Sequence, residues 1–150
     1  MELFRISLKK HAHKLTASGR PNRWNKRDEY VIYAGSSRSL SSLELVVHRG
    51  SIELLESYKV MVISVADDDE LTTQIKIKEL TDNWRRTTAY PFLQDIGSEW
   101  YRSRESLLLK VPSAVIPQEF NYLINSNHPD FEDHITLVRT ENYFWDERLL

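Results

Sequence analysis

The chain of 150 residues lacks cysteine altogether and contains only four glycines and five prolines. Without cysteine there is no disulfide framework and no thiolate chemistry, which fits a reducing compartment such as the cytoplasm. No stretch approaches the roughly 18 apolar residues of a membrane-spanning helix, and the N-terminus has no apolar core of a secretory signal. We therefore predict a cytoplasmic protein with a single domain over residues 1–150 and no membrane partner.

The common signatures of phosphate loops, zinc sites and serine nucleophiles are missing as well. His11 and His13 lie in a polar stretch, and the acidic run from Asp67 to Glu70 lacks the alternating spacing of a calcium loop. The sequence thus predicts no metal site. If the chain binds a dinucleotide, arginines must neutralise the pyrophosphate, because guanidinium groups match phosphate oxygens bidentately.

The net charge of −2 is spread unevenly along the chain. Residues 1–50 hold ten Lys/Arg against four Asp/Glu, whereas residues 51–150 hold ten against eighteen. The basic third is either part of a mixed solvated surface or a region that attracts a phosphate-bearing ligand. A direct nucleic-acid partner is disfavoured, because the remaining two-thirds of the chain are acidic.

Short apolar segments bounded by turn residues are the main secondary-structure signal. They predict strands at residues 3–7, 30–34, 58–65, 74–78, 106–111 and 135–139. One helix is predicted from an N-cap at Ser39 to Arg49, with Gly50 as its stop. Residues 9–27 and 80–100 are predicted to be loop-rich, the second because of Pro91 and Gly97. Many short mixed or antiparallel strands and few helices predict a compact α+β domain.

Three residues spaced about ten apart suit a pocket for an anionic, ribose-bearing ligand. Arg23 can clamp phosphate, Tyr33 can stack or donate a hydrogen bond, and the Glu44 carboxylate can stabilise positive charge at a reacting sugar carbon. Tyr33 and Glu44 also have an ordinary structural interpretation. Tyr33 ends an apolar run and could be a core residue, and Glu44 flanks the apolar stripe of the predicted helix and could pair with Arg49.

Two further residues carry open alternatives. Arg5 lies inside an apolar strand, where its charge is costly unless it pairs with a core carboxylate or binds an anionic ligand. Ser113 follows Pro112 at the end of a predicted buried strand and is either a capping residue or a hydroxyl of the pocket.

An ordered set of short motifs resembles the RES domain, the toxin of a bacterial toxin–antitoxin pair, over nearly the whole chain. The motifs in the first half are 4–7 (FRIS), 23–25 (RWN), 31–34 (VIYA), and 43–44 with 47–48 (LE, VH). Those in the second half are 94–97 (QDIG), 111–114 (VPSA), 121–125 (NYLIN) and 128–131 (HPDF), and then Asp146 with Arg148-Leu149. The chain departs from the family pattern at two places. The family usually has a glycine one or two residues before its Arg-Trp, whereas Gly19 stands four residues before Arg23. The family's Asn-Pro before its His-Pro is Asn125-Ser126 here.

The resemblance implies a fold like that of ADP-ribosyltransferase toxins, with two sheets and a nicotinamide pocket between them. It implies a type II toxin that cleaves the nicotinamide–ribose bond of NAD with water or phosphate as acceptor, depleting NAD and arresting growth. Glu44, Arg23 and Tyr33 would be catalytic, and Arg5, Arg23, Tyr33 and Ser113 would bind NAD, without a metal. The partner would be an antitoxin with a Cro-repressor-like helix-turn-helix that blocks the active site, in a homo-oligomer or hetero-oligomer.

Three alternatives remain at this point. One is an ADP-ribosyltransferase that modifies a metabolic protein, and another is an inactive member that only binds its partner. Binding alone would not require Arg23, Tyr33 and Glu44 together, which argues against the inactive member. An RNase is disfavoured, because the histidines are scattered and the overall charge is negative.

Overall fold

The computed structural model describes residues 1–48 and 56–149, and within them seven strands join in one mixed sheet. The strands are β1 (Glu2–Leu8), β2 (Val31–Gly35), β3 (Tyr58–Val65), β4 (Thr72–Gln74), β5 (Leu108–Pro112), β6 (Phe120–Asn125) and β7 (Ile135–Tyr143). Their order is β4-β5-β6-β2-β1-β3-β7, and only the β4–β5 pair is parallel. The α+β prediction is confirmed.

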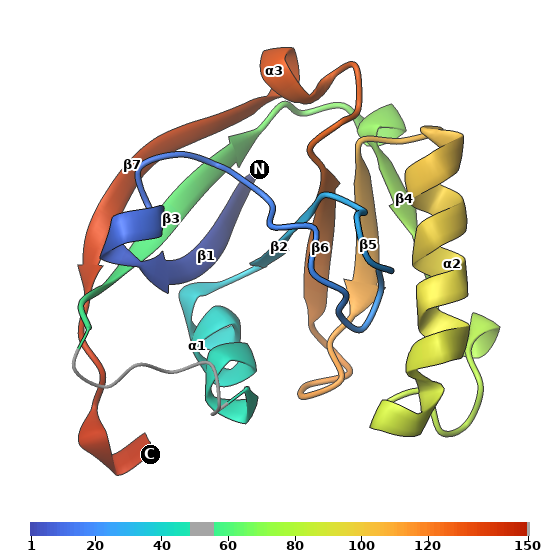
Figure 1. Ribbon diagram of the computed structural model, residues 1–150, viewed down its shortest axis with the longest axis horizontal. Coiled ribbons are helices and arrows are strands. Elements are labelled where there is room, and N and C mark those ends of the chain that lie inside the picture. The colour runs from blue at the N-terminus through green and yellow to red at the C-terminus, as the bar shows by residue number, and fades with distance from the viewer. Residues whose placement is uncertain (49–55, 150) are drawn as a thin grey trace.

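The sheet is narrow at its middle, where β2 meets β1. Strands β1 and β3 pair along seven residues, and β2 and β6 along five, but β1 and β2 share one pair, Phe4 with Gly35. Figure 1 shows the result: β1, β3 and β7 form one group, β4, β5 and β6 another, and β2 crosses between them. The two sheets that the resemblance implied are therefore one sheet, which opens beside this single pair.

The two faces of β2, β5 and β6 are both buried. Ile32, Leu108 and Ile124 belong to one apolar cluster, and Val31 and its partners on the opposite face belong to a second. This alternation follows from the period of two in a strand. Loop and helix residues cover both faces, so β2 is held rigidly where its side chains meet the candidate site.

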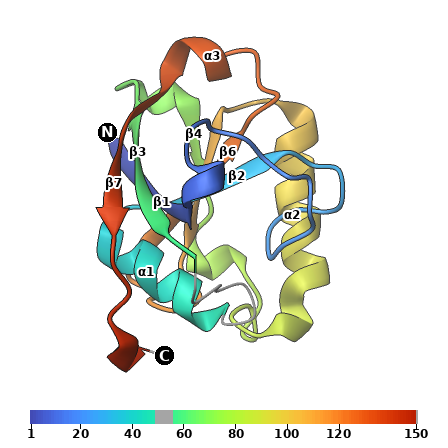
Figure 2. The same ribbon diagram turned by 60° about the vertical axis from the view of Figure 1, so that its left-hand side comes forward.

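Helix α1 (Arg38–Val47) lies below the β1–β2 junction in Figures 1 and 2. Its N-cap is Ser37, whose Oγ accepts the Leu40 N–H at 3.0 Å, so the predicted N-cap at Ser39 is wrong by two residues. The predicted end at Arg49 and stop at Gly50 lie outside the described residues. Leu40 is buried, and Ser41 Oγ donates to the Phe4 carbonyl at 2.8 Å, which fastens the helix to β1.

Helix α2 (Tyr90–Ser103) corrects the prediction of a loop-rich segment at residues 80–100. Pro91 stands in its first turn, where a proline costs no hydrogen bond. Position 97 of the helix requires glycine, because a Cβ there would be 1.6 Å from the Trp24 carbonyl oxygen. Leu93 and Trp100 pack from α2 onto the β5–β6 half of the sheet, which Figure 1 shows beside the helix.

The remaining strand predictions differ in extent. The predicted strand at 74–78 is wrong, since β4 ends at Gln74 and residues Ile77–Glu79 form a 3-10 turn. The last strand runs to Tyr143, four residues beyond the prediction, because it pairs with β3 along its length. The segment after β1 forms a short 3-10 turn (Lys9–His11) and is otherwise irregular, as predicted.

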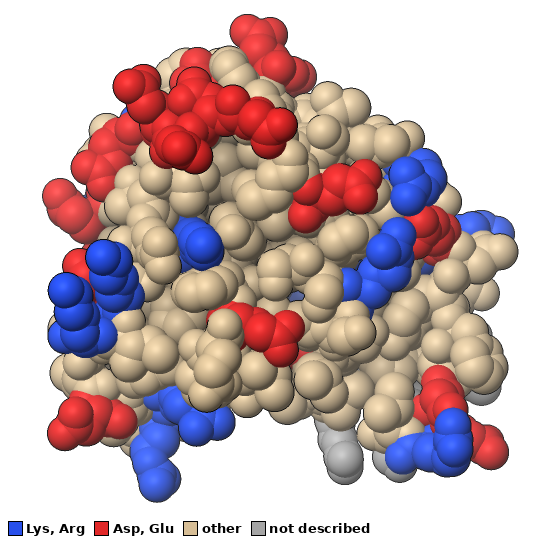
Figure 3. Space-filling view, turned by 180° about the vertical axis from the view of Figure 1, so that it is seen from behind, with Lys and Arg blue, Asp and Glu red and all other residues tan. Residues whose placement is uncertain are grey.

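Charged side chains are unevenly placed on the back of the molecule. Figure 3 shows Asp and Glu gathered on the upper part of that face, with Lys and Arg in separate small groups. A nucleic-acid partner requires a continuous basic surface. The face in Figure 3 does not provide one.

Candidate active site

A cavity of about 310 Å³ opens at the β1–β2 junction. Its lining residues are Phe4, Arg5 and Ile6 of β1, Tyr33, Ala34 and Gly35 of β2, Ser41, Glu44 and Leu45 of α1, and Asn22, His48 and Asn121. It therefore brings together three of the five predicted site residues, Arg5, Tyr33 and Glu44. A second cavity of about 440 Å³, lined by Met1 and Asp67 among others, contains none of the five.

Arg5 spans the opening between the two strands. Its Nη1 donates to the Tyr33 carbonyl at 2.9 Å, which gives that carbonyl a partner where β1 and β2 have separated. Within the described part of the chain no carboxylate forms an ion pair with Arg5, and burial lowers the pKa of its guanidinium. A partly buried, uncompensated positive charge at a cavity wall favours an anionic ligand.

Glu44 points from α1 to the end of β5 and the start of β6. Its Oε1 accepts the Ser113 hydroxyl at 2.6 Å and the Asn121 amide at 2.7 Å. Ser113 is fully buried, and its Oγ in turn accepts the N–H groups of Val115 and Ile116 at 3.0 and 3.1 Å. Ser113 thus caps the turn after β5 and holds the Glu44 carboxylate, but it does not line the cavity, so its role as a pocket hydroxyl stays a prediction.

Asn121 is a site residue that the sequence reasoning missed. It lines the cavity and supplies the second donor to Glu44, and in the sheet it pairs with Gly35 of β2. Nothing in the local pattern distinguishes it from an ordinary strand residue. Its place in the motif 121–125 was the one available signal.

Tyr33 lines the cavity, but its hydroxyl is already engaged. The hydroxyl donates to Asn25 Oδ1 at 2.6 Å and accepts the Trp24 N–H at 3.2 Å. Burial is the main cause that raises the pKa of Tyr33 above its usual range, so the hydroxyl stays neutral. The side chain therefore ties the loop of residues 20–29 to β2, and its ring, rather than a free hydroxyl, is available to a ligand.

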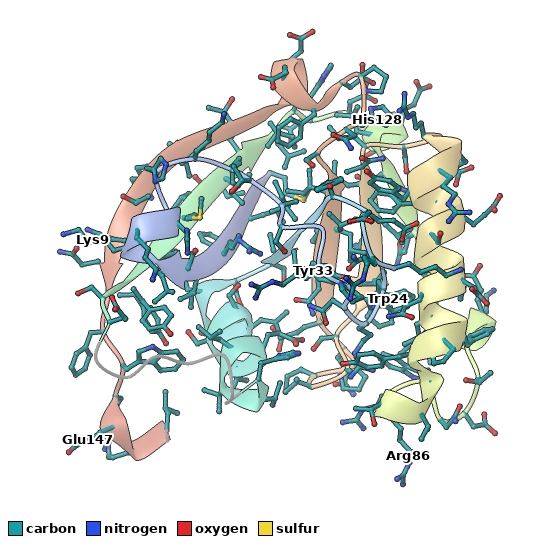
Figure 4. The ribbon with its side chains drawn as sticks, viewed as in Figure 1. Lys9, Trp24, Tyr33, Arg86, His128 and Glu147 are labelled. Atoms are coloured by element: carbon teal, nitrogen blue, oxygen red, sulfur yellow. The ribbon has the colours of Figure 1, made fainter. Side chains whose placement is uncertain are left out.

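The loop of residues 20–29 is fixed on its other side by α2. Buried Glu29, 5% exposed, accepts the Ser98 hydroxyl at 2.5 Å and the Lys26 N–H at 2.7 Å. Gln94 Nε2 donates to the Asn22 carbonyl at 2.8 Å. Figure 4 shows Trp24 beside α2 and Tyr33 nearer the middle of the molecule. The loop is therefore held between β2 and α2.

Arg23, which this loop carries, does not line the cavity. Its Nη1 donates to the carbonyls of Trp84 and Arg85, both at 3.2 Å, and its guanidinium lies 4.7 Å from the centre of the Tyr90 ring. Arg23 stands in the chain between Asn22, which lines the cavity, and Trp24, whose N–H donates to the Tyr33 hydroxyl, so its backbone adjoins the cavity. Of the three residues spaced about ten apart in the sequence, Tyr33 and Glu44 thus line the cavity, and Arg23 lies outside it.

Among residues 1–48 and 56–149, no group of three or more His, Cys, Asp or Glu side chains is arranged to hold a metal ion. None of the described helices has the length and apolarity that crossing a bilayer requires.

Comparison with known proteins places this geometry in a family context. The profile of the RES domain matches residues 2–146. A protein named Toxin Res from Yersinia enterocolitica is 33% identical over 99% of both chains. A Toxin Res of Photorhabdus laumondii is 31% identical over 85% of this chain and 81% of its own. A protein named Prs ADP-ribosylating toxin, from a Sphingobium strain, is 33% identical over 85% of this chain and 80% of its own.

Proposed function

This chain belongs to the RES domain family, and on that premise we propose that it is a toxin that cleaves the nicotinamide–ribose bond of NAD. The observation that carries the proposal is the shared cavity of Arg5, Tyr33 and Glu44, in which the carboxylate is held by two donors. A guanidinium suits the phosphates of a dinucleotide, and a fixed carboxylate suits a cationic sugar carbon.

The reaction breaks the bond between the ribose anomeric carbon and the nicotinamide ring nitrogen. The bonding pair goes to the nitrogen, which is positively charged in NAD, so nicotinamide leaves neutral and no acid is needed. Positive charge grows on the sugar carbon, and Glu44 stabilises it electrostatically. An acceptor oxygen then bonds to that carbon and its proton passes to solvent.

The roles of the other residues follow from their positions. Ser113 and Asn121 occupy Oε1 of Glu44, which leaves Oε2 for the ribose. Arg5 and Arg23 bind phosphate, and the Tyr33 ring packs at the nicotinamide side. NAD is the substrate, and no metal takes part in these steps.

We further propose a cytoplasmic type II toxin–antitoxin system in which NAD loss arrests growth. The partner is an antitoxin with a Cro-repressor-like helix-turn-helix, which covers the active site. In this proposal the acceptor is water or phosphate.

A protein side chain is the second candidate acceptor, because a 33% identical relative is named an ADP-ribosylating toxin. The chemistry at the sugar carbon would be the same and only the attacking group would differ. Both candidate reactions therefore require Glu44, and the reaction product distinguishes them.

The test is incubation of the purified protein with NAD in buffer, with inorganic phosphate, and with a cell lysate plus NAD labelled in its adenosine half. We expect free nicotinamide, together with ADP-ribose, its phosphate ester, or a labelled protein. Glu44→Gln keeps the shape and both hydrogen bonds but removes the charge, so nicotinamide release should fall about 100-fold or more.

The matched control is Glu99→Gln, an exposed carboxylate on α2, which should behave as the unmodified protein. Induced expression should arrest growth and deplete NAD with the unmodified protein and with Glu99→Gln, but not with Glu44→Gln. The absence of free nicotinamide from NAD under all three conditions would overturn the proposed function.

A further inference from the structure

The cavity is small for the proposed substrate. Its volume of about 310 Å³ lies at the lower end of the ~300–1,000 Å³ typical of ligand pockets. It suits the nicotinamide–ribose half of a dinucleotide, so the pyrophosphate and the adenosine half must extend past its edge. Because the pyrophosphate is negatively charged, we expect positively charged side chains at the edge of the cavity that it crosses.

Arg85 lies in a hydrogen-bonded chain that runs from Arg23 to Ala114, two residues that adjoin the site without lining the cavity. Arg23 Nη1 donates to the Arg85 carbonyl at 3.2 Å, and Arg85 Nε donates to the Ala114 carbonyl at 2.8 Å. Ala114 directly follows Ser113, which holds Glu44, whereas Arg23 directly precedes Trp24, whose N–H donates to the Tyr33 hydroxyl. Arg85 therefore links Arg23 to the segment that follows Ser113.

Both guanidinium groups keep an edge open for a ligand. Arg85 uses Nε for Ala114, which leaves the edge formed by its two Nη atoms. Arg23 uses Nη1, which leaves the edge formed by Nε and Nη2. Either edge can bind two oxygens of a phosphate at once.

Within residues 1–48 and 56–149, no carboxylate neutralises either charge. Both arginines are held by carbonyl oxygens, and the structure forms no ion pair of Arg23 or Arg85 with a carboxylate of the described residues. Some other exposed arginines do pair: Arg38 binds Glu141, and Arg148 binds Asp146. A guanidinium group that carbonyl oxygens orient and no carboxylate neutralises can bind phosphate oxygens bidentately.

We propose that Arg85 and Arg23 together clamp the pyrophosphate of the dinucleotide at the edge of the cavity, an assignment that rests on the proposed function. Arg85 is then a binding residue rather than only a brace between the segment at 84–86 and Ala114. Arg5, inside the cavity, is left for the phosphate nearest the reacting ribose.

The kinetic test compares NAD with nicotinamide mononucleotide, which has the same reacting bond but no pyrophosphate. Arg85→Ala should raise the KM for NAD about 10- to 100-fold with kcat nearly unchanged, because the lost contact is made equally before and during the reaction. Cleavage of the mononucleotide should change less than about 2-fold. Arg85→Lys keeps the charge but loses the bidentate guanidinium geometry, so its KM for NAD should lie between those of Arg85→Ala and the unmodified protein.

The matched control is Arg86→Ala. Arg86 is the exposed neighbour, and Figure 4 shows it pointing away from the body of the molecule. This variant should keep the KM of the unmodified protein for both substrates.

A binding measurement separates the clamp from the chemistry. Calorimetry with ADP-ribose, which carries the pyrophosphate, should give a Kd at least 10-fold weaker for Glu44→Gln/Arg85→Ala than for Glu44→Gln. An unchanged Kd, or equal losses with NAD and the mononucleotide, would mean that Arg85 only braces the Ser113 segment. Failure of the unmodified protein to cleave NAD would instead count against the proposed function, while the ADP-ribose result would still decide the clamp.

Discussion

At the scale of single residues, Glu44 depends on donors from two different elements. Ser113 directly follows β5 and Asn121 is the second residue of β6, and both hydrogen bonds reach the same carboxylate oxygen. A carboxylate held in this way cannot rotate away from the cavity. Its position is therefore set by the β5–β6 pair rather than by α1 alone.

We predict that Asn121→Ala lowers kcat for NAD cleavage about 10-fold, because one charge-assisted hydrogen bond to Glu44 is lost. KM should change little if Asn121 acts through Glu44. Asn121→Asp should be worse, since it places a second carboxylate against Glu44. A loss that appears in KM alone would show instead that Asn121 binds the substrate itself.

Tyr33 allows a prediction about pH. The unfolded chain releases the tyrosine proton near pH ~10, and burial raises the pKa of Tyr33 in the folded protein. Above that pH the folded state binds more protons than the unfolded state, so stability falls as pH rises.

Tyr33→Phe should therefore reduce the fall in melting temperature between about pH 8 and pH 10.5. At neutral pH it should cost roughly 1–2 kcal/mol, because Asn25 and the Trp24 N–H lose their partner. Thermal melts across this range are the measurement. Tyr30→Phe, at an exposed tyrosine, is the control, and an equally steep fall in Tyr33→Phe and the unmodified protein would contradict the prediction.

At the scale of elements, α2 and the loop of residues 20–29 form one unit. The close contact is between Gly97 and the Trp24 carbonyl, where an added Cβ would lie 1.6 Å from the oxygen. Backbone atoms cannot give way as a flexible side chain does. Arg23 is thus placed by a helix more than 60 residues away in the sequence.

We predict that Gly97→Ala destabilises the protein by about 3 kcal/mol or more, although alanine favours helices, because the clash is with backbone. Urea unfolding is the measurement. Glu99→Ala, in an exposed position of the same helix, should change stability by less than about 0.5 kcal/mol. A Gly97→Ala variant as stable as Glu99→Ala would contradict this account.

The sequence was sufficient for strands with a clear apolar run and insufficient where an interaction from elsewhere decided the structure. Tyr58–Val65 was predicted at its full extent, because eight strand-forming residues leave no alternative. Helix α2 was missed, because Pro91 and Gly97 are also typical of loops. Only the contact with Trp24 explains the glycine.

The same limit applies to the candidate site. Arg5, Tyr33 and Glu44 were found from their residue types and motifs, and they do line one cavity. Asn121 and Arg85 were not, because their roles arise from neighbours distant in sequence: Glu44 for one, Arg23 and Ala114 for the other.

At the scale of the whole molecule, the cavity lies where the sheet is held by a single residue pair. Phe4 and Gly35 join the two groups of strands, and Arg5 adds a side-chain link to Tyr33. A ligand in the cavity contacts both groups at once. Binding should therefore stabilise the junction as well as fill the pocket.

We predict that a non-cleavable NAD analogue at about 100 times its Kd stabilises the protein by about 2.7 kcal/mol, or roughly 5–10 °C in melting temperature. Hydrogen exchange should slow at residues 4–6 and 33–35. Arg5→Met should lose most of this shift at the same analogue concentration, whereas Lys10→Met, at an exposed site, should not. Stabilisation without slower exchange at the junction would place the ligand elsewhere.

The order of strands has a consequence for the synthesis of the protein. Strand β2 emerges early, but its neighbour β6 and the anchors Ser113 and Asn121 emerge only after residue 112. A growing chain on the ribosome thus carries Arg5, Tyr33 and Glu44 without a fixed carboxylate. Chains that terminate before residue 113 would lack both anchors of Glu44, so the proposed NAD cleavage would begin only after β6 has emerged.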